Sequence, residues 1–260
     1  MKFYFDCGLP RSGSTLLTAI LNQNPDIHAG VMSPVSELME AADYIFQQEQ
    51  ATVFPKPYVF KTIVRSLILN YYSDRVEPII IDKSRLWPDY IGLLKKYITP
   101  NPKLICVHRN VLDILASWIT LIHKSKELSY VDKGLKEWGV NFCDDNRCHY
   151  LMQPSGILYK SLESIKYASK HHAGNLHMIH YDDLTSKPKD TLDKLHLFLN
   201  IDPYTYNFNS IVAKEREDDS YYGLPTMHEI RSELKKISKP YTEVLSKDII
   251  DKYKDYKYYD

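Results

Sequence analysis

The stretch that decides the fold is Gly8-Leu9-Pro10-Arg11-Ser12-Gly13-Ser14-Thr15. An apolar run at residues 3–7 leads directly into it, and a helix-period segment at residues 15–21 follows. Two glycines that bracket four residues let the backbone curl, so that successive N–H groups converge on one anion. The start of the following helix adds partial positive charge. This order of strand, loop and helix predicts a binding site for phosphate or a phosphate-like group.

The loop has the Gly-x-x-x-x-Gly spacing of nucleotide triphosphate loops, but it lacks their lysine. Ser14 stands where that lysine would reach the β- and γ-phosphates. This serine weighs against ATP or GTP as the ligand. A purely structural strand-to-helix turn is the alternative interpretation, because Ser12 or Ser14 as N-cap would account for the hydroxyls.

Four short apolar runs predict buried strands of a parallel sheet, because strands covered on both faces lack polar alternation. They are residues 3–7, 78–81, 104–107 and 176–179. Helix-period segments lie at residues 15–21, 35–47, 61–70, 89–97, 112–122, 157–169 and 191–199. Strand followed by helix, repeated, predicts a doubly wound α/β domain over residues 1–260. We expect a P-loop-containing nucleotide-binding fold with a central parallel β-sheet flanked by helices.

Two segments in the last quarter of the chain have a distinct composition. All six residues 214–219 are charged, which predicts an exposed or mobile loop. The tail at residues 246–260 is rich in lysine and tyrosine, and we expect an amphipathic closing helix that frays.

The composition argues against several classes of partner. Lysine plus arginine balance aspartate plus glutamate at 33 each, so no basic field favours nucleic acid or an anionic membrane. The chain starts in a strand-like run without signal-peptide features, and no stretch approaches the roughly 20 apolar residues of a membrane helix. The spacing of Cys143, Cys148 and His149 matches no zinc pattern. We expect a cytoplasmic protein with no metal, no nucleic-acid partner and no membrane association.

A second anion site is predicted where the third expected strand ends, at Arg109. Ser117 follows eight residues later, a little over two helical turns, so both side chains can face one anion. Lys83 lies just past the second expected strand. Ligands in open α/β sheets bind outside the carboxyl ends of strands, which places Lys83 in the same crevice as Arg11 and Arg109. A sheet-capping arginine and a serine bonded to its own helix are the alternative.

With these motifs in place, the chain resembles the sulfotransferases that use 3'-phosphoadenosine 5'-phosphosulfate (PAPS), particularly the tyrosylprotein sulfotransferase-like branch. The resemblance rests on residues 8–30, including Asn24-Pro25-Asp26, and on the spacing of Arg109 and Ser117. It weakens after residue 206. It implies the sulfotransferase fold, with PAPS as the co-substrate.

The resemblance also implies a set of cofactor-binding residues: Arg11, Ser12, Gly13, Ser14, Thr15, Arg109, Ser117 and Tyr181. The arginine of the loop would contact the oxygen that bridges phosphorus and sulfur, and the four loop residues after it would cradle the 5'-phosphate. Arg109 and Ser117 would bind the 3'-phosphate, and Tyr181 would line the nucleotide site. Lys83 would assist the departing phosphate. Family members add a serine and a lysine from a late loop, for which Ser220 and Lys236 are the nearest candidates.

The general base is the point at which the sequence departs from the family's pattern. The tyrosylprotein branch has a glutamate after its Asn-Pro equivalent, but an ungapped count from the loop arginine reaches Met32. Glu37 is the predicted substitute, since an insertion in the turn could bring it into place. It equally suits a helix start with Ser33 as N-cap. Glu40, His28 or an amine acceptor that needs no strong base stay open.

We therefore expect in-line transfer of a sulfuryl group from PAPS to a hydroxyl or amine of a small-molecule or peptide acceptor, releasing adenosine 3',5'-bisphosphate. Arg11, Lys83 and Glu37 are the expected catalytic residues. A P-loop small-molecule kinase using ATP, kept open by Asp82, and a non-catalytic nucleotide-binding module are the rival functions. Residues 30–50 and 142–155 are expected to select the acceptor. The sequence assigns neither that acceptor nor an oligomeric state.

Overall fold

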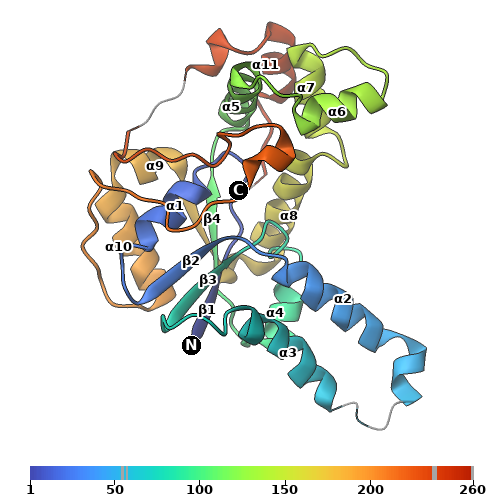
Figure 1. The fold of residues 1–260 in the computed structure, drawn as a ribbon, viewed down its shortest axis with the longest axis vertical. Coiled ribbons are helices and arrows are strands. Elements are labelled where there is room, and N and C mark those ends of the chain that lie inside the picture. Colours follow the sequence, from blue (N-terminus) through green and yellow to red (C-terminus); the bar gives the residue numbers. More distant parts are fainter. Residues whose placement is uncertain (54–55, 57, 236–238, 259–260) are drawn as a thin grey trace.

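The computed structural model describes residues 1–53, 56, 58–235 and 239–258. The β-strands in this part of the chain form one sheet in the order β2-β3-β1-β4-β5, and every neighbouring pair is parallel. The strands are β1 (Lys2–Asp6), β2 (Ile27–Met32), β3 (Ile79–Lys83), β4 (Leu104–His108) and β5 (Leu176–His180). The predicted central parallel sheet flanked by helices is confirmed (Figure 1).

The α-helices alternate with these strands and continue beyond them. They are α1 (Ser14–Leu21), α2 (Val35–Gln47), α3 (Val59–Tyr71), α4 (Ile91–Tyr97), α5 (Val111–Lys124), α6 (Tyr130–Glu137), α7 (Asp144–Met152), α8 (Ile157–His172), α9 (Tyr181–Ser186), α10 (Pro188–Leu199) and α11 (Lys247–Tyr253). Short 3-10 helices are η1 (Glu49–Val53), η2 (Ala173–Asn175), η3 (Asp219–Tyr222) and η4 (Tyr241–Glu243). Within the described residues no helix is both long and apolar enough to cross a membrane.

Successive residues of β1 point to opposite faces of the sheet, and this alternation divides the core in two. Phe5 packs into a cluster with residues of α2, α3, α4, α5 and α8. Tyr4 belongs to the other cluster, which is built from α1, α9 and α10. Helices therefore cover both faces, which explains why the strands read as continuous apolar runs.

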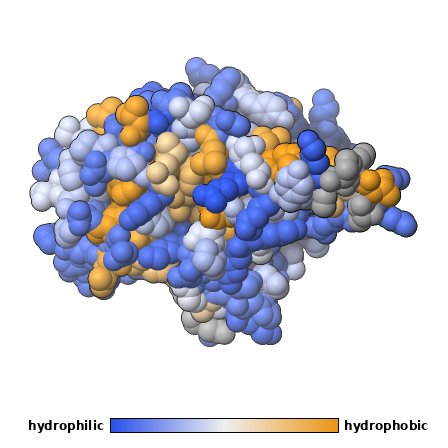
Figure 2. All heavy atoms as spheres, turned by 90° about the horizontal axis from the view of Figure 1, so that it is seen from below, coloured by the Kyte–Doolittle hydropathy of each residue, from blue (hydrophilic) through white to orange (hydrophobic). Residues whose placement is uncertain are grey.

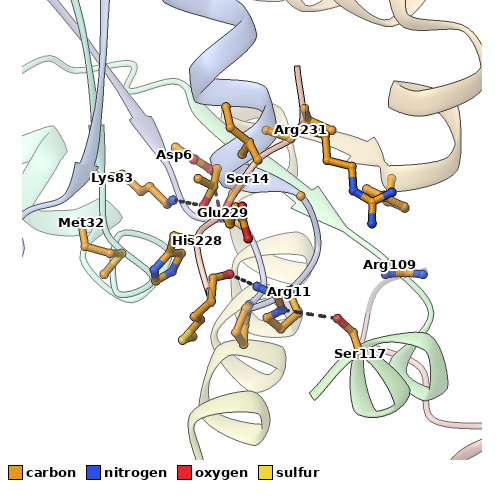
Figure 3. Close-up of a pocket in the computed structure, with 18 of the residues that line it drawn as sticks. Asp6, Arg11, Ser14, Met32, Lys83, Arg109, Ser117, His228, Glu229 and Arg231 are labelled. Atoms are coloured by element: carbon orange, nitrogen blue, oxygen red, sulfur yellow. Dashed lines mark hydrogen bonds between the residues drawn. The ribbon is translucent and has the colours of Figure 1, made fainter. Parts of the chain in front are cut away.

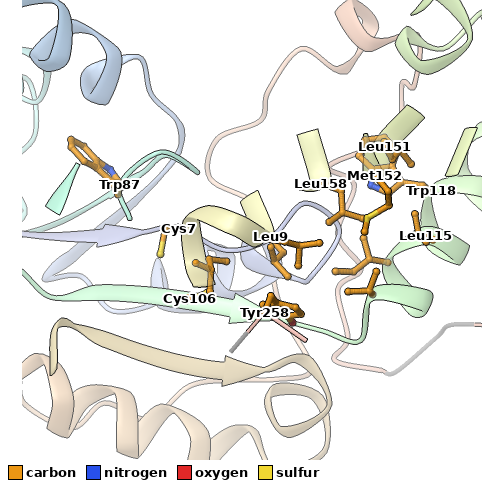
Figure 4. Close-up of a cluster of buried hydrophobic side chains, with 14 of the residues drawn as sticks. Cys7, Leu9, Trp87, Cys106, Leu115, Trp118, Leu151, Met152, Leu158 and Tyr258 are labelled. Atoms are coloured by element: carbon orange, nitrogen blue, oxygen red, sulfur yellow. The ribbon is translucent and has the colours of Figure 1, made fainter. Parts of the chain in front are cut away.

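The larger cluster contains two fully buried tryptophans, Trp87 and Trp118 (Figure 4). The Trp87 ring meets Phe5 edge to face at 4.8 Å between centroids, and its indole N–H donates to Asp82 at 2.7 Å. This bond satisfies the one polar atom of the Trp87 ring. Asp82 thus takes part in the packing of the core beneath β3.

The helices α2 and α3 form a hairpin that extends away from the sheet (Figure 1). Near its base, Val35, Met39, Val64 and Ile68 are fully buried. At its far end hydrophobic residues are exposed, as Figure 2 shows beside the grey residues. The hairpin is therefore anchored to the core mainly through its base.

Several elements are present that the sequence did not indicate. The strand β2 was hidden because His28 and Gly30 interrupt a short apolar run that follows a proline turn. The helix α7 buries only Cys148, Leu151 and Met152, too few positions to give a helical period. The predicted closing helix is shorter than expected: α11 begins after Ser246, whose hydroxyl caps it by accepting from the Ile249 N–H, and ends at Tyr253.

The prediction that residues 214–219 form an exposed loop is only half correct. The segment is irregular up to η3, but its residues alternate between solvent and the interior. Glu215 forms an ion pair with Arg75 at 2.7 Å, and a Glu217 carboxylate oxygen accepts from the Met32 N–H at 3.3 Å. Asp219 is buried. A run of charged residues is therefore not fully exposed here, because every second side chain has a polar partner in the interior.

Asp82 offers a test of this core. Its fully buried carboxylate accepts from the Ser33 hydroxyl (2.6 Å), the Tyr72 hydroxyl (2.6 Å) and the Trp87 indole. We expect Asp82→Ala to lower the free energy of unfolding by about 2 to 4 kcal/mol, because three buried donors lose their acceptor. Urea denaturation measures the change. Asp74→Ala, at a side chain that is 68% exposed, is the control and should stay within about 0.5 kcal/mol. Equal stability of the two variants would contradict the assignment.

Candidate active site

The loop between β1 and α1 holds two residues in left-handed backbone conformations. Arg11 has a φ of 62° and Gly13 a φ of 100°. A side chain at Gly13 would also place its Cβ 2.7 Å from the Tyr181 ring, so this position requires glycine. A left-handed arginine is energetically costly, and such strain concentrates at functional sites.

Ser12 ties this loop to the sheet. Its fully buried hydroxyl lies 2.6 Å from the carbonyl oxygens of Leu9 and of Val107, to which it donates. Val107 belongs to β4, the neighbour of β1, so the bond fixes the loop relative to a second strand. The Ser12 side chain is committed to the loop's own structure and does not line the adjacent cavity.

A cavity of about 240 Å³ lies at the carboxyl end of the sheet, where the loop, β3 and β4 meet residues 227–235 (Figure 3). Basic side chains outnumber acidic ones on its wall. The basic residues are Arg11, Lys83, Arg85, Arg109, Arg231 and Lys235, and the acidic ones are Asp6, Glu229 and Glu233. This excess of positive charge favours an anionic guest, although the chain as a whole is neutral.

Arg109 is a buried cation with unused donors. Its side chain is 5% exposed, and its guanidinium stacks on the Tyr181 ring at 4.6 Å. Its Nε and Nη2 donate no hydrogen bond to any described residue, and its Nε lies 3.9 Å from the Asp113 carboxylate. A buried guanidinium with free N–H groups on a cavity wall is suited to an anion such as phosphate.

Arg11 and Ser117 are brought together beside Arg109. The Nε of Arg11 donates to the Ser117 hydroxyl at 3.3 Å, and its Nη1 donates to the Met227 carbonyl. Burial and the nearby Arg109 guanidinium both lower the pKa of Arg11. Like charges held this close repel each other, which an anion between them would relieve.

Lys83 stands on the opposite side of the loop, next to Asp6. The two residues are register partners at the ends of β3 and β1. The ammonium of Lys83 donates to the Thr15 hydroxyl at 3.2 Å. Burial lowers the pKa of Lys83, and the Asp6 carboxylate opposes that change. Asp6 is buried itself, which raises its pKa, while it accepts from the Gly8 N–H at 3.0 Å.

The cavity gathers eight of the residues singled out from the sequence: Arg11, Gly13, Ser14, Thr15, Lys83, Arg109, Ser117 and Tyr181. Ser12 and Glu37 are not on its wall. Glu37 is exposed in the first turn of α2, and its carboxylate accepts from the Ser36 hydroxyl at 2.5 Å. Met32, the residue that the ungapped count reaches in place of the family's glutamate, also lines the cavity.

No pattern in the sequence indicated that residues 227–235 would form part of the cavity wall. These residues have no regular secondary structure and no periodic pattern, so only the fold brings His228, Glu229 and Arg231 to the site. Ser220 is exposed and donates to the Asp218 carboxylate at 2.5 Å. Lys236, the other late-loop candidate, lies outside the described residues.

Comparison with known proteins adds an independent finding. A family model described as "Sulfotransferase family" matches residues 5–205. No curated protein sequence matches the chain significantly.

Solved structures with similar folds include two sulfotransferases. The chain is 16% identical to the sulfotransferase domain from the curacin biosynthetic pathway, with a TM-score of 0.50 over 98% of this chain and 90% of that one. It is 12% identical to mouse sulfotransferase SULT7A1 complexed with PAP, with a TM-score of 0.57 over 98% of this chain and 82% of that one. Likeness at these identities shows a shared fold.

Ser12 provides the test of how the loop is held. We expect Ser12→Ala to lower the free energy of unfolding by about 0.5 to 1.5 kcal/mol, because the buried hydrogen bonding of its hydroxyl to the Leu9 and Val107 carbonyls is lost while each carbonyl keeps a backbone N–H donor. Chemical denaturation measures this. Ser73→Ala removes an exposed hydroxyl that bonds within its own turn and serves as the control. A Ser12→Ala protein as stable as the control would show that the loop is held by other contacts.

Proposed function

This chain belongs to the sulfotransferase family, and we propose that its sulfuryl donor is PAPS and its acceptor a hydroxyl or amine of a small molecule or peptide. Family membership supports sulfuryl transfer in general. The assignment to the tyrosylprotein branch stays a prediction.

The observation that carries the donor assignment is the buried, unsatisfied guanidinium of Arg109. Its free N–H groups, 3.9 Å or more from any carboxylate in the described chain, need an anionic acceptor, and Ser117 lies on the same wall. PAPS carries a 3'-phosphate that ATP lacks. Arg109 and Ser117 bind this phosphate, and the Tyr181 ring on which Arg109 stacks lines the nucleotide site.

The loop takes the other end of the donor. Gly13, Ser14 and Thr15 surround the 5'-phosphate with N–H and hydroxyl groups at the start of α1. Arg11 and Lys83 offset the charge that develops on the oxygen between phosphorus and sulfur as the bond to sulfur breaks. The acceptor oxygen or nitrogen attacks sulfur from the opposite side and gives up its proton to a base.

The kinase alternative is not favoured. It required Asp82 to hold a metal ion at a strand end, but both oxygens of this carboxylate accept buried hydrogen bonds from Ser33, Tyr72 and Trp87. Asp82 also does not line the cavity. Ser14, which stands where a kinase loop has its lysine, is a second argument against a kinase.

The nucleotide assignment is tested first by metal dependence. We expect adenosine 3',5'-bisphosphate to bind with unchanged affinity in the presence of EDTA, because fixed cations and N–H groups meet its charge. ADP should bind more weakly. Isothermal titration calorimetry with both nucleotides, with and without EDTA, provides the measurement. Binding that EDTA abolishes, or a preference for ADP with magnesium, would reject the donor assignment.

Arg109 tests which phosphate is recognised. Charge-assisted hydrogen bonds contribute about 1.5 to 3 kcal/mol each, so Arg109→Ala should reduce affinity for adenosine 3',5'-bisphosphate by about 10- to 100-fold. Affinity for adenosine 5'-monophosphate, which has no 3'-phosphate, should hardly change. The exposed Arg216, which does not line the cavity, gives the matched control Arg216→Ala. Equal losses for both nucleotides in a variant with a normal melting curve would show that Arg109 does not read the 3'-phosphate.

A further inference from the structure

His228 is held in one orientation by a single carboxylate. Its ring Nδ1 lies 2.5 Å from one oxygen of Asp219, and its backbone N–H donates to the other oxygen at 2.8 Å. Asp219 is fixed in η3 and is buried. With the proton on Nδ1 facing Asp219, the lone pair of the neutral ring is on Nε2, for which no partner is recorded among the described residues. This is the arrangement by which an aspartate orients a histidine base.

The ring lies on the cavity wall beside groups proposed to act on the donor. The preceding residue, Met227, accepts from Arg11 through its carbonyl oxygen, so this part of the wall touches the loop directly. Figure 3 shows His228 next to Met32, on the same side of the cavity as Lys83. A base at this place can reach an acceptor that lies in line with the bond to the loop-bound phosphate.

One further carboxylate connects His228 with Met32. Glu217 accepts from the Met32 N–H through one oxygen at 3.3 Å, and its other oxygen lies 3.6 Å from the His228 Nδ1. By the ungapped count, Met32 occupies the position at which the tyrosylprotein branch has its glutamate. His228 is therefore a proton acceptor near the position of Met32, but it comes from a part of the chain that is distant in sequence.

The charges around the ring keep it poised as a base. Burial lowers the pKa of His228, and the Lys83 ammonium acts in the same direction, while Glu217 and Asp219 oppose them. The Tyr222 ring packs nearby at 6.5 Å between centroids. A lowered pKa leaves the imidazole neutral at neutral pH, and protonation as the pH falls removes its ability to accept.

We propose that His228, oriented by Asp219, is the general base that deprotonates the acceptor. The proposal rests on the proposed sulfuryl transfer. As the new bond forms from the acceptor oxygen or nitrogen to sulfur, the bond from sulfur to the bridging oxygen breaks and its electron pair stays on adenosine 3',5'-bisphosphate. The acceptor proton passes to the His228 Nε2, while the proton on Nδ1 stays with the ring. Asp219 acts as a positioning residue.

Glu37 is the rival base, and the pair of variants His228→Gln and Glu37→Gln separates the two. Release of labelled adenosine 3',5'-bisphosphate from PAPS is followed with phenol as the acceptor. A parallel reaction without phenol measures the hydrolysis of PAPS by water. We expect His228→Gln to slow release by about 100-fold or more, the usual contribution of general base catalysis. His171→Gln makes the same change at an exposed position of α8 and is the control. Loss in Glu37→Gln with a normal rate in His228→Gln would overturn the proposal.

Three further readouts separate the role of the base from donor binding and from folding. Calorimetry should find normal affinity for adenosine 3',5'-bisphosphate in folded His228→Gln, whereas failure of the wild type to bind it would reject the donor assignment instead. The wild-type rate should fall as the pH drops through the lowered pKa of His228, and Asp219→Asn should alter this profile with donor affinity intact. NMR of nitrogen-labelled histidine needs no acceptor: the expected form is Nδ1–H, and a neutral ring protonated on Nε2 would overturn the proposal.

Discussion

Because β1 pairs in parallel with both β3 and β4, the carboxyl ends of three strands meet at one edge of the sheet. Two cations of the cavity wall, Lys83 and Arg109, are placed by this pairing. It sets Lys83 in register with Asp6 and places Arg109 directly after the neighbouring strand. The Ser12 hydroxyl, bonded to the Val107 carbonyl, then holds the loop against β4. A parallel sheet thus collects charges from distant parts of the chain without any of them being neighbours in sequence.

The cavity brings two buried guanidinium groups close together. The Arg109 guanidinium lies close enough to help lower the pKa of Arg11, and two donors of Arg109 have no acceptor within the described chain. Buried charges without partners are costly, and the core must offset that cost. An anion that bridges the two arginines converts this cost into affinity. The aromatic face of Tyr181 keeps Arg109 aimed while the anion is absent.

Residues 214–219 contribute carboxylates that contact Arg75, Met32 and His228. Of the charged residues 214–219, every second one faces inward: Glu215 to Arg75, Glu217 to Met32 and His228, and Asp219 to His228. Acidic side chains thereby fix a stretch without regular structure and, at the same time, orient the histidine on the cavity wall. One set of contacts accounts for both the conformation of the segment and the proposed proton transfer.

The sequence by itself determined the parallel sheet, the glycine loop after β1 and the cations at the strand ends, because these depend on local patterns: apolar runs, two glycines and short spacings such as that from Arg109 to Ser117. It missed β2, where His28 and Gly30 interrupt the apolar run, and it left the base at Glu37, a residue that the fold keeps exposed in the first turn of α2. Only the tertiary structure placed His228 on the cavity wall on the same side as Lys83, since the contact of Glu217 with Met32 joins segments 185 residues apart in sequence. Such contacts depend on how the chain folds and on which side chains become buried. In a segment without regular secondary structure, neither produces a periodic pattern in the sequence.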